Sequence, residues 1–263
     1  MDKTLKRLAL MAHLFLFCGL LSVPAHATDV AGASDSSNPS VLVELFTSEG
    51  CSSCPPADAL LREINGLKTR AGQLIVGISE HVTYWNGLGW SDPYSSEIYT
   101  ARQNAYGGRF RLDSVYTPQM VINGTEQIVG SDRRALEQAL PDEDGRSQIP
   151  LRILLAKIAN GVLNLTFAAD GTKVREGTDI IAVLADDVDH STVLRGENSG
   201  QTLAHVAVAR SLARVATVHG PTEKTVQLPL PGSVFVGEGG HHIILFAQTA
   251  GLGPVLGIDS KPI

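Results

Sequence analysis

The sequence predicts an α/β domain followed by an all-β, sandwich-like domain. Up to residue 140, strand-length apolar runs alternate with helical patterns in the order β-α-β-α-β-β-α. After Pro150 the pattern changes to short alternating runs separated by turn signals, which is typical of a β-sandwich. The chain has 263 residues and is 43% hydrophobic, enough to bury a sizeable core. We expect the α/β domain to span residues 41–145 and the β-sandwich domain residues 150–263.

The N-terminal segment has the pattern of a secretory signal peptide. Three basic residues precede an apolar run that ends near residue 23, and Ala25-His26-Ala27 has the small-x-small form of a cleavage site. The alternative is an uncleaved anchor, but the run is short for a membrane span of about 20 residues. We therefore expect a signal peptide at residues 1–27 and a flexible leader at 28–40. The protein is then soluble after cleavage and located in the periplasm or secreted.

The elements of the α/β domain follow from apolar periodicity and turn residues. Strands are predicted at residues 41–46, 74–79, 119–122 and 127–129, the last two joined by the hairpin turn Asn123-Gly124. The first two strands are joined by a helix and should be parallel. A second helix begins near Ser95-Ser96, presents Ile98, Ala101 and Ala105 on one face, and ends at Gly107-Gly108. A short helix capped by Ser131-Asp132 closes the domain.

The second domain is predicted as a series of strands. Asn160-Gly161 joins the first two, at residues 151–159 and 162–168. Further strand-like runs lie at residues 179–185, 202–212, 215–219, 225–230, 241–248 and 255–258. Residues 204–215 also fit a helix, and the sequence leaves both assignments open.

The motif that carries chemistry is Cys51-Ser52-Ser53-Cys54. It lies between a buried strand and a helix whose first turn contains Pro55 and Pro56. A helix N-terminus stabilises a thiolate, and the thiolate is the nucleophile in thiol–disulfide exchange. The third cysteine, Cys18, leaves with the signal peptide, and an oxidising compartment permits a Cys51–Cys54 disulfide. We expect Cys51 to be the more exposed, attacking sulfur and Cys54 to resolve the mixed disulfide.

The order of strand, C-x-x-C, helix, strand, helix, Thr-Pro, hairpin and helix resembles the thioredoxin fold. The resemblance implies a cis-proline at Pro118, preceded by Thr117, at the start of the third core strand and facing the disulfide. It also gives Glu44 the role of the buried acid beneath the motif, although the spacing from Glu44 to Cys51 is one residue longer than in many thioredoxin-fold proteins. The aromatic residue that usually precedes the first cysteine is replaced by Gly50.

More narrowly, the chain is similar to a family of secreted bacterial thioredoxin-like proteins of unassigned function. The stretches that carry this similarity are Glu44 to Pro56, His81 to Trp85, Leu88 to Trp90, Tyr116 to Met120 and, in the second domain, Arg195 to Asn198. Arg195 and Glu197 are interpreted as an intramolecular brace that could tie the two domains together, with a substrate contact as the alternative.

The loop from His81 to Trp90 follows the second parallel strand and should lie near the cysteines, because parallel neighbours end at the same sheet edge. Tyr84, Trp85 and Trp90 form either an apolar platform for a partner protein or a cap on the core. His81 either moves a proton to or from the thiols or is a satisfied polar residue.

The cysteine pair also fits three other roles. A structural disulfide closing so short a loop stabilises little. A zinc site is disfavoured because the sequence holds no second C-x-x-C, and His81 would supply only a third ligand. Cu(I) is the stronger rival, since thiolates select it and Met120 lies two residues after Pro118.

The sequence therefore predicts thiol–disulfide exchange with a protein thiol or disulfide partner, catalysed by Cys51 and Cys54 with no metal or other cofactor. The alternative is a non-catalytic binding protein, such as a Cu(I) carrier or an adaptor. A net charge of −6 argues against a nucleic-acid partner. The direction of electron flow and the oligomeric state do not follow from the sequence.

Overall fold

A computed structural model describes residues 39–141, 149–172, 177–230 and 240–263. The predicted signal peptide lies outside the described residues, as do positions 28–38 of the predicted leader and positions 142–145 at the end of the predicted α/β domain. None of the helices in the described part of the chain is both long and apolar enough to cross a membrane.

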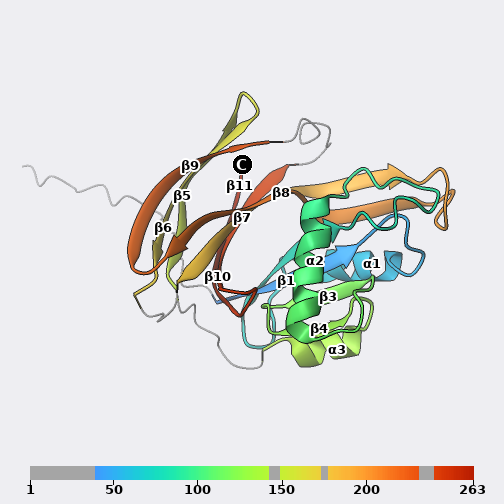
Figure 1. The fold of residues 1–263 in the computed structure, drawn as a ribbon, viewed down its shortest axis with the longest axis horizontal. Helices are drawn as coiled ribbons and strands as arrows, with labels where there is room; N and C mark the ends of the chain where they lie inside the picture. Colours follow the sequence, from blue (N-terminus) through green and yellow to red (C-terminus); the bar gives the residue numbers. More distant parts are fainter. Residues whose placement is uncertain (1–38, 142–148, 173–176, 231–239) are drawn as a thin grey trace, which may run out of the picture. The chain divides into compact units, whose positions relative to one another are not determined.

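The fold is dominated by a mixed sheet of eight strands in the order β11-β10-β7-β8-β2-β1-β3-β4 (Figure 1). These strands are β1 (Ser40–Thr47), β2 (Leu74–His81), β3 (Gln119–Ile122), β4 (Glu126–Val129), β7 (Thr178–Thr192), β8 (Thr202–Val218), β10 (His241–Thr249) and β11 (Val255–Pro262). A second, three-stranded sheet contains β5 (Leu151–Ala159), β6 (Val162–Asp170) and β9 (Pro221–Pro229). The helices are α1 (Pro55–Ile64), α2 (Glu97–Phe110) and α3 (Arg133–Ala139).

The predicted fold class is wrong. The chain is mostly β, and its large sheet takes strands from both halves, so there is neither a thioredoxin-like α/β domain nor a separate sandwich. The two halves join where β8 pairs in parallel with β2 at Ser79 and Val208. The predicted β-α-β unit is present, because β1 and β2 pair in parallel in full register. The prediction failed because β2 uses its second edge to continue the sheet, and local periodicity carries no information on such a non-local pairing.

The two faces of the large sheet are covered by different elements. Val43 and Leu45 of β1 pack with α1 and α3, whereas the intervening Leu42 packs in a cluster with Tyr99 of α2. This alternation is what the two-residue period of a strand requires. At the β7 and β10 end, Ile180 and Ile243 pack against the three-stranded sheet.

Two local predictions are corrected. In α2 the predicted face is exposed, and the buried face is instead formed by polar and aromatic side chains, namely Tyr99, Arg102, Gln103 and Tyr106. The helix also continues through Gly107, where a Cβ would lie 2.9 Å from Val115 Cγ1. The glycine therefore permits a close approach of the following loop and does not end the helix.

The open assignment of residues 204–215 is settled by the structure, which gives strand throughout β8. The strands β3 and β5 match their predicted bounds, and α3 begins after Asp132, whose side chain accepts a hydrogen bond from Ala135 N.

Candidate functional site

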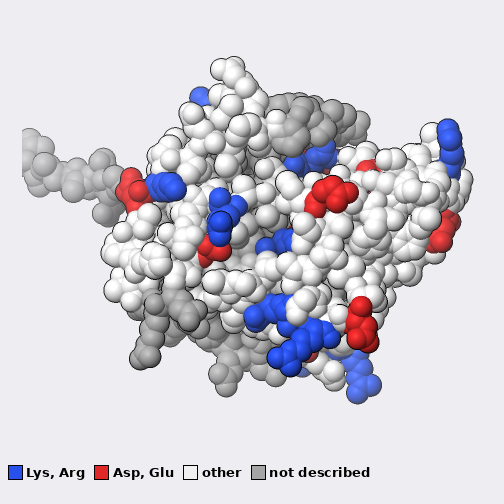
Figure 2. Space-filling model, in the orientation of Figure 1, with Lys and Arg blue, Asp and Glu red and all other residues white. Residues whose placement is uncertain are grey.

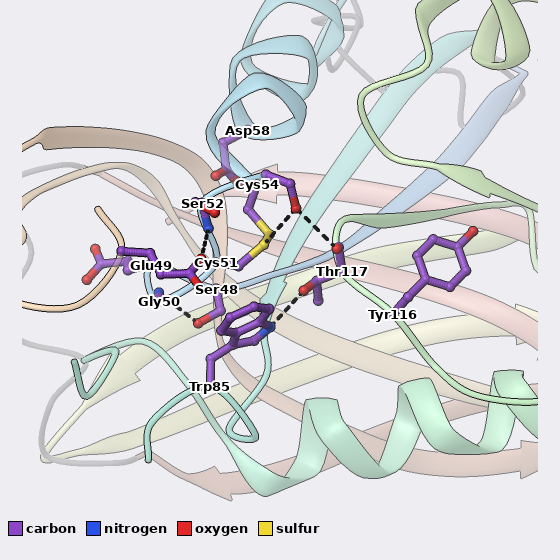
Figure 3. Close-up of a disulfide and its surroundings, with 12 residues drawn as sticks. Ser48, Glu49, Gly50, Cys51, Ser52, Cys54, Asp58, Trp85, Tyr116 and Thr117 are labelled. Atoms are coloured by element: carbon purple, nitrogen blue, oxygen red, sulfur yellow. Dashed lines mark hydrogen bonds between the residues drawn. A yellow bond between two sulfur atoms is a disulfide. The ribbon is translucent and has the colours of Figure 1, made fainter. Parts of the chain in front are cut away.

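Cys51 and Cys54 form a disulfide at the junction between the loop after β1 and the start of α1 (Figure 3). Cys54 is the N-cap residue, and Pro55 and Pro56 occupy the first turn, as the sequence predicts. The backbone amides of Ala57 and Asp58 donate to the carbonyl oxygen of Cys54, at 2.8 and 3.1 Å. The helix therefore begins directly behind the second sulfur.

Both cysteines are fully buried in this oxidised state. Each has a relative exposure of 0%, whereas Ser52 and Ser53 between them are exposed. The expectation that Cys51 is the more exposed sulfur is therefore wrong for the structure as it stands. Ser53 Oγ lies 3.3 Å from Cys51 Sγ, close enough to donate a hydrogen bond to that sulfur. A reaction at Cys51 requires the cover over the sulfurs to shift.

A cis peptide bond between Thr117 and Pro118 directly precedes β3, as the resemblance implies. Ser53 Oγ lies 3.5 Å from the Thr117 carbonyl oxygen, which brings this segment next to the C-x-x-C loop (Figure 3). Trp85 Nε1 donates to Thr117 Oγ1 at 2.8 Å, and a Cβ placed on Gly50 would lie 3.0 Å from Trp85 Cβ. Trp85 thus packs where a side chain before Cys51 would otherwise stand, which gives a physical reason for Gly50.

The three predicted platform aromatics separate into two roles. Trp85 and Trp90 are partly buried, and both of their indole N–H groups bind within the protein; the Trp90 N–H donates to Glu49 Oε2 at 2.7 Å. Tyr84 is 40% exposed and donates to Gln103 Oε1. The tryptophans brace the disulfide loop, and of the three Tyr84 presents the largest exposed surface.

Glu44 is buried, but its partners lie on α2. Arg102 Nε donates to Glu44 Oε1 at 2.5 Å, and Tyr106 OH donates to Glu44 Oε2 at 2.7 Å. Glu80, 3.7 Å from Arg102, shares the cluster. Burial raises the pKa of Glu80 well above its usual value, and the neighbouring Glu44 carboxylate raises it further. Glu44 thus belongs to a network on the α2 face, while the residues on either side of it pack toward α1.

His81 is buried at the end of β2 and is connected to the disulfide loop through Asp92. Its Nδ1 lies 2.7 Å from Asp92 Oδ2, and the same oxygen accepts the backbone N–H of Glu49 at 2.8 Å. Burial raises the pKa of Asp92, but His81 and the backbone hydrogen bonds outweigh it and hold the pKa below its usual value. The structure therefore brings His81 into the support of the loop, two residues before Cys51.

A buried cluster that the sequence analysis missed lies on the α1 side of this loop. The imidazole of His205, on β8, sits between two carboxylates: Nε2 is 3.4 Å from Glu49 Oε1, and Nδ1 is 3.7 Å from Asp58 Oδ1. Its ring also lies edge-on to that of His81, with the centroids 4.8 Å apart. Burial alone would lower the pKa of His205, but Asp58 and Glu49 raise it to about 10. A protonated His205 therefore offsets two negative charges beside the disulfide.

The signals for this cluster were weak but present. Glu49 directly precedes Gly50-Cys51, and Asp58 falls on the buried face of α1, four residues after Cys54. His205 lies in the stretch whose secondary structure the sequence left open.

The turn between β7 and β8, residues 193–201, holds the disulfide loop from the other side. Asn198 is buried, and its side-chain amide donates to the carbonyl oxygens of Glu49 and Cys51 at 2.9 and 3.0 Å. The Ser52 backbone N–H donates to Glu197 Oε2 at 3.1 Å, and hydrogen bonds from Ser52 lower the pKa of Glu197. The brace predicted for Arg195 and Glu197 is thus made by Glu197 and Asn198 to the loop itself.

Within the described residues, no group of three or more His, Cys, Asp or Glu side chains is arranged to hold a metal ion. Met120, named as a possible sulfur ligand, is fully buried in the core cluster between β1 and α1.

The fold and the site define a mostly β protein that carries a disulfide at a strand–helix junction. Residues 42–248 match the family described as "Protein of unknown function (DUF1223)", and the chain belongs to this family. The matched range contains both cysteines, Pro118 and the 193–201 turn.

Two solved structures share much of this architecture. A crystal structure of a protein from Agrobacterium tumefaciens is 28% identical with a TM-score of 0.60, and the alignment covers 84% of this chain and 92% of that one. HBP35 of Porphyromonas gingivalis has a TM-score of 0.62, and the alignment covers 86% of this chain and 76% of that one. The sequence identity is only 13%, so the likeness is limited to the fold. No curated protein matches the sequence.

Proposed function

We propose that this protein is an exported thiol–disulfide oxidoreductase that acts through Cys51 and Cys54. The observation that carries the proposal is the Cys51–Cys54 disulfide at the N-terminus of α1, beside the cis Thr117–Pro118 peptide. The proposed likeness to thioredoxin-like proteins is limited to this local arrangement of strand, C-x-x-C, helix and cis-proline strand. Export agrees with the signal-peptide pattern and with cysteines that are joined as a disulfide.

The proposed reaction balances without a cofactor. The Cys51 thiolate attacks one sulfur of a partner disulfide, the partner's other sulfur leaves as a thiolate, and a mixed disulfide forms. The Cys54 thiolate then attacks Cys51 Sγ and expels the partner's remaining thiolate. The protein ends as the disulfide and the partner as a dithiol after protonation; the reverse sequence oxidises a partner.

The surroundings support a reactive Cys51 thiolate. Ser53 Oγ is placed to donate to it, and the N–H groups at the start of α1 give the helix end a positive field. His205 neutralises part of the charge of the Glu49 and Asp58 carboxylates, which would otherwise disfavour a Cys51 thiolate nearby.

The test is a trapping experiment with a peptide disulfide. Cys54→Ser should accumulate a mixed disulfide through Cys51, detected by mass spectrometry, because the resolving thiol is gone. Cys51→Ser, the matched control, should accumulate far less. Equal trapping by both variants, or none by either, contradicts the proposal.

A Cu(I) titration of the reduced protein tests the alternative role of a copper carrier. That role predicts one tightly bound ion, which is lost in Cys51→Ser.

A further inference from the structure

Two loops that meet beside the disulfide form an open groove. One lies between β2 and α2, and the other is the 193–201 turn. The groove has a volume of about 510 Å³ and is lined by Asn86, Gly87, Gly89, Trp90, Ser91, Leu194 and Arg195. This volume falls within the range of roughly 300–1,000 Å³ typical of binding sites.

The two loops touch through glycines. Gly89 and Gly196 both have positive φ, at +107° and +78°. A Cβ on Gly89 would lie 3.3 Å from Gly196 Cα, and a Cβ on Gly196 would lie 3.3 Å from Trp90 Cβ. The backbones can approach this closely only because side chains are absent, so the juxtaposition that forms the groove is specified by sequence.

The groove and its rim expose apolar surface. Leu194 is 68% exposed, the largest value among the exposed large hydrophobic side chains of the described residues, and Leu88, next to Gly89, is 62% exposed. A single exposed leucine is ordinary, but two on touching loops beside a partly exposed tryptophan mark an interaction surface. In Figure 2 the end of the β7–β8 hairpin, at the right of the view, carries both blue and red surface amid uncharged surface.

Arg195 gives the groove a charge. Among the described residues no carboxylate forms an ion pair with Arg195, and its neighbour Glu197 accepts a hydrogen bond from the Ser52 N–H. An arginine beside the apolar side chains of Trp90 and Leu194 complements a partner with a carboxylate next to an apolar side chain.

The walls of the groove are bonded directly to the disulfide loop. Trp90 binds Glu49, Glu197 binds the Ser52 N–H, and Asn198 binds the Cys51 carbonyl oxygen. A polypeptide in the groove therefore contacts residues that bond directly to Glu49, Ser52 and Cys51 of the disulfide loop.

We propose that this groove binds an extended segment of a protein substrate, with an apolar side chain against Trp90 and Leu194 and an acidic side chain on Arg195. The inference rests on the proposed function and names its substrate class: a cysteine flanked by apolar and acidic residues. The groove gives selectivity, while the chemistry stays with Cys51 and Cys54.

Binding is measured on the Cys51→Ser/Cys54→Ser protein, so that affinity is separated from exchange. Fluorescently labelled peptides carry Leu-Glu, Ser-Glu or Leu-Lys beside a serine that replaces the cysteine, and anisotropy reports Kd. The parent should prefer Leu-Glu over each of the others by at least about tenfold, which corresponds to ~1.4 kcal/mol. Arg195→Glu should reverse the preference between Leu-Glu and Leu-Lys, and Leu194→Ser should remove the preference between Leu-Glu and Ser-Glu.

The matched controls are Arg152→Glu and Leu154→Ser, which change exposed residues on β5 of the other sheet and should leave all three affinities unchanged. Unchanged preferences in the Arg195 and Leu194 variants overturn the proposal. A protein that sediments as a dimer and becomes monomeric on Arg195→Glu also overturns it, because the occupant is then a second copy.

Exchange with bis(2-hydroxyethyl) disulfide separates the two proposals. A wild-type protein that exchanges with this small disulfide but shows no peptide preference retains the proposed function and loses the groove. A protein that binds selectively but does not exchange retains the groove as a docking site and loses the proposed function.

Discussion

Two buried ionic clusters flank β1, and they differ in how closely the cation contacts a carboxylate. In the first, Arg102 holds Glu44 at 2.5 Å and also donates to Tyr106 and Gln248. In the second, His205 lies 3.4 and 3.7 Å from its two carboxylates, distances of ion pairs without close hydrogen bonds. The tight cluster joins β1 to α2 and β10, whereas the loose one lies against the disulfide loop. The comparison indicates that the first is structural and that the second sets the charge around the cysteines.

The largest effect is expected from breaking the tight cluster. Arg102→Met leaves Glu44 and Glu80 buried without their cation, and should lower the free energy of unfolding by about 3–5 kcal/mol. Urea denaturation measures this. Arg133→Met removes the exposed pair with Glu63 and is the control, with little change expected. Equal effects of the two substitutions would show that the Arg102 network does not hold the fold together.

The second effect is a pH dependence carried by His205. Its pKa is raised from an ordinary 6.5 to about 10 in the folded protein, so its contribution to stability is fully present below pH 6.5 and is lost as pH rises toward 10. His205→Gln should therefore destabilise the protein most at pH 6 and progressively less toward pH 10. Urea midpoints of both proteins at pH 6, 8 and 10 measure the difference, and a pH-independent difference contradicts the charged His205.

The third effect tests whether the 193–201 turn controls the access of a reductant to the disulfide. Asn198→Ala removes the two hydrogen bonds to the loop carbonyls, so we expect dithiothreitol to reduce the native disulfide about tenfold faster. Ser199→Ala is the matched control, because Ser199 lies in the same turn and its hydroxyl donates to Leu194 O and not to the disulfide loop. Stopped-flow tryptophan fluorescence follows the reduction. Equal rates in the wild type and Asn198→Ala would show that the turn does not control access.

The smallest effect is expected at Ser53. Ser53→Ala removes the hydroxyl 3.3 Å from Cys51 Sγ, and the pKa of the Cys51 thiol in the reduced protein should rise because its thiolate loses a hydrogen bond. Thiolate absorbance near 240 nm as a function of pH measures the shift. Ser53→Thr keeps a hydroxyl and should restore most of the wild-type pKa. If it does not, the hydroxyl at this position does not stabilise the Cys51 thiolate.

The local parts of this site could be predicted from the sequence, and the non-local parts could not. The disulfide, the start of α1 at Pro55 and the cis bond at Pro118 follow from a short motif and a resemblance. The contacts of His205 and Asn198 depend on the pairing of β8 with β2, which brings residues some 150 positions apart into contact. Apolar periodicity also could not predict the buried face of α2, because Arg102 and Gln103 on that face are polar. Their partners Glu44 and Gln119 lie on β1 and β3, far away in the sequence.

The proposed function requires the Cys51–Cys54 disulfide to exchange while the protein stays folded. The most direct measurement equilibrates the native protein with dithiothreitol or glutathione mixtures without denaturant, and counts free thiols while circular dichroism monitors the fold. We expect reversible two-electron reduction with the fold retained. A disulfide that stays oxidised until the protein unfolds would contradict it, and would show that the bond is structural.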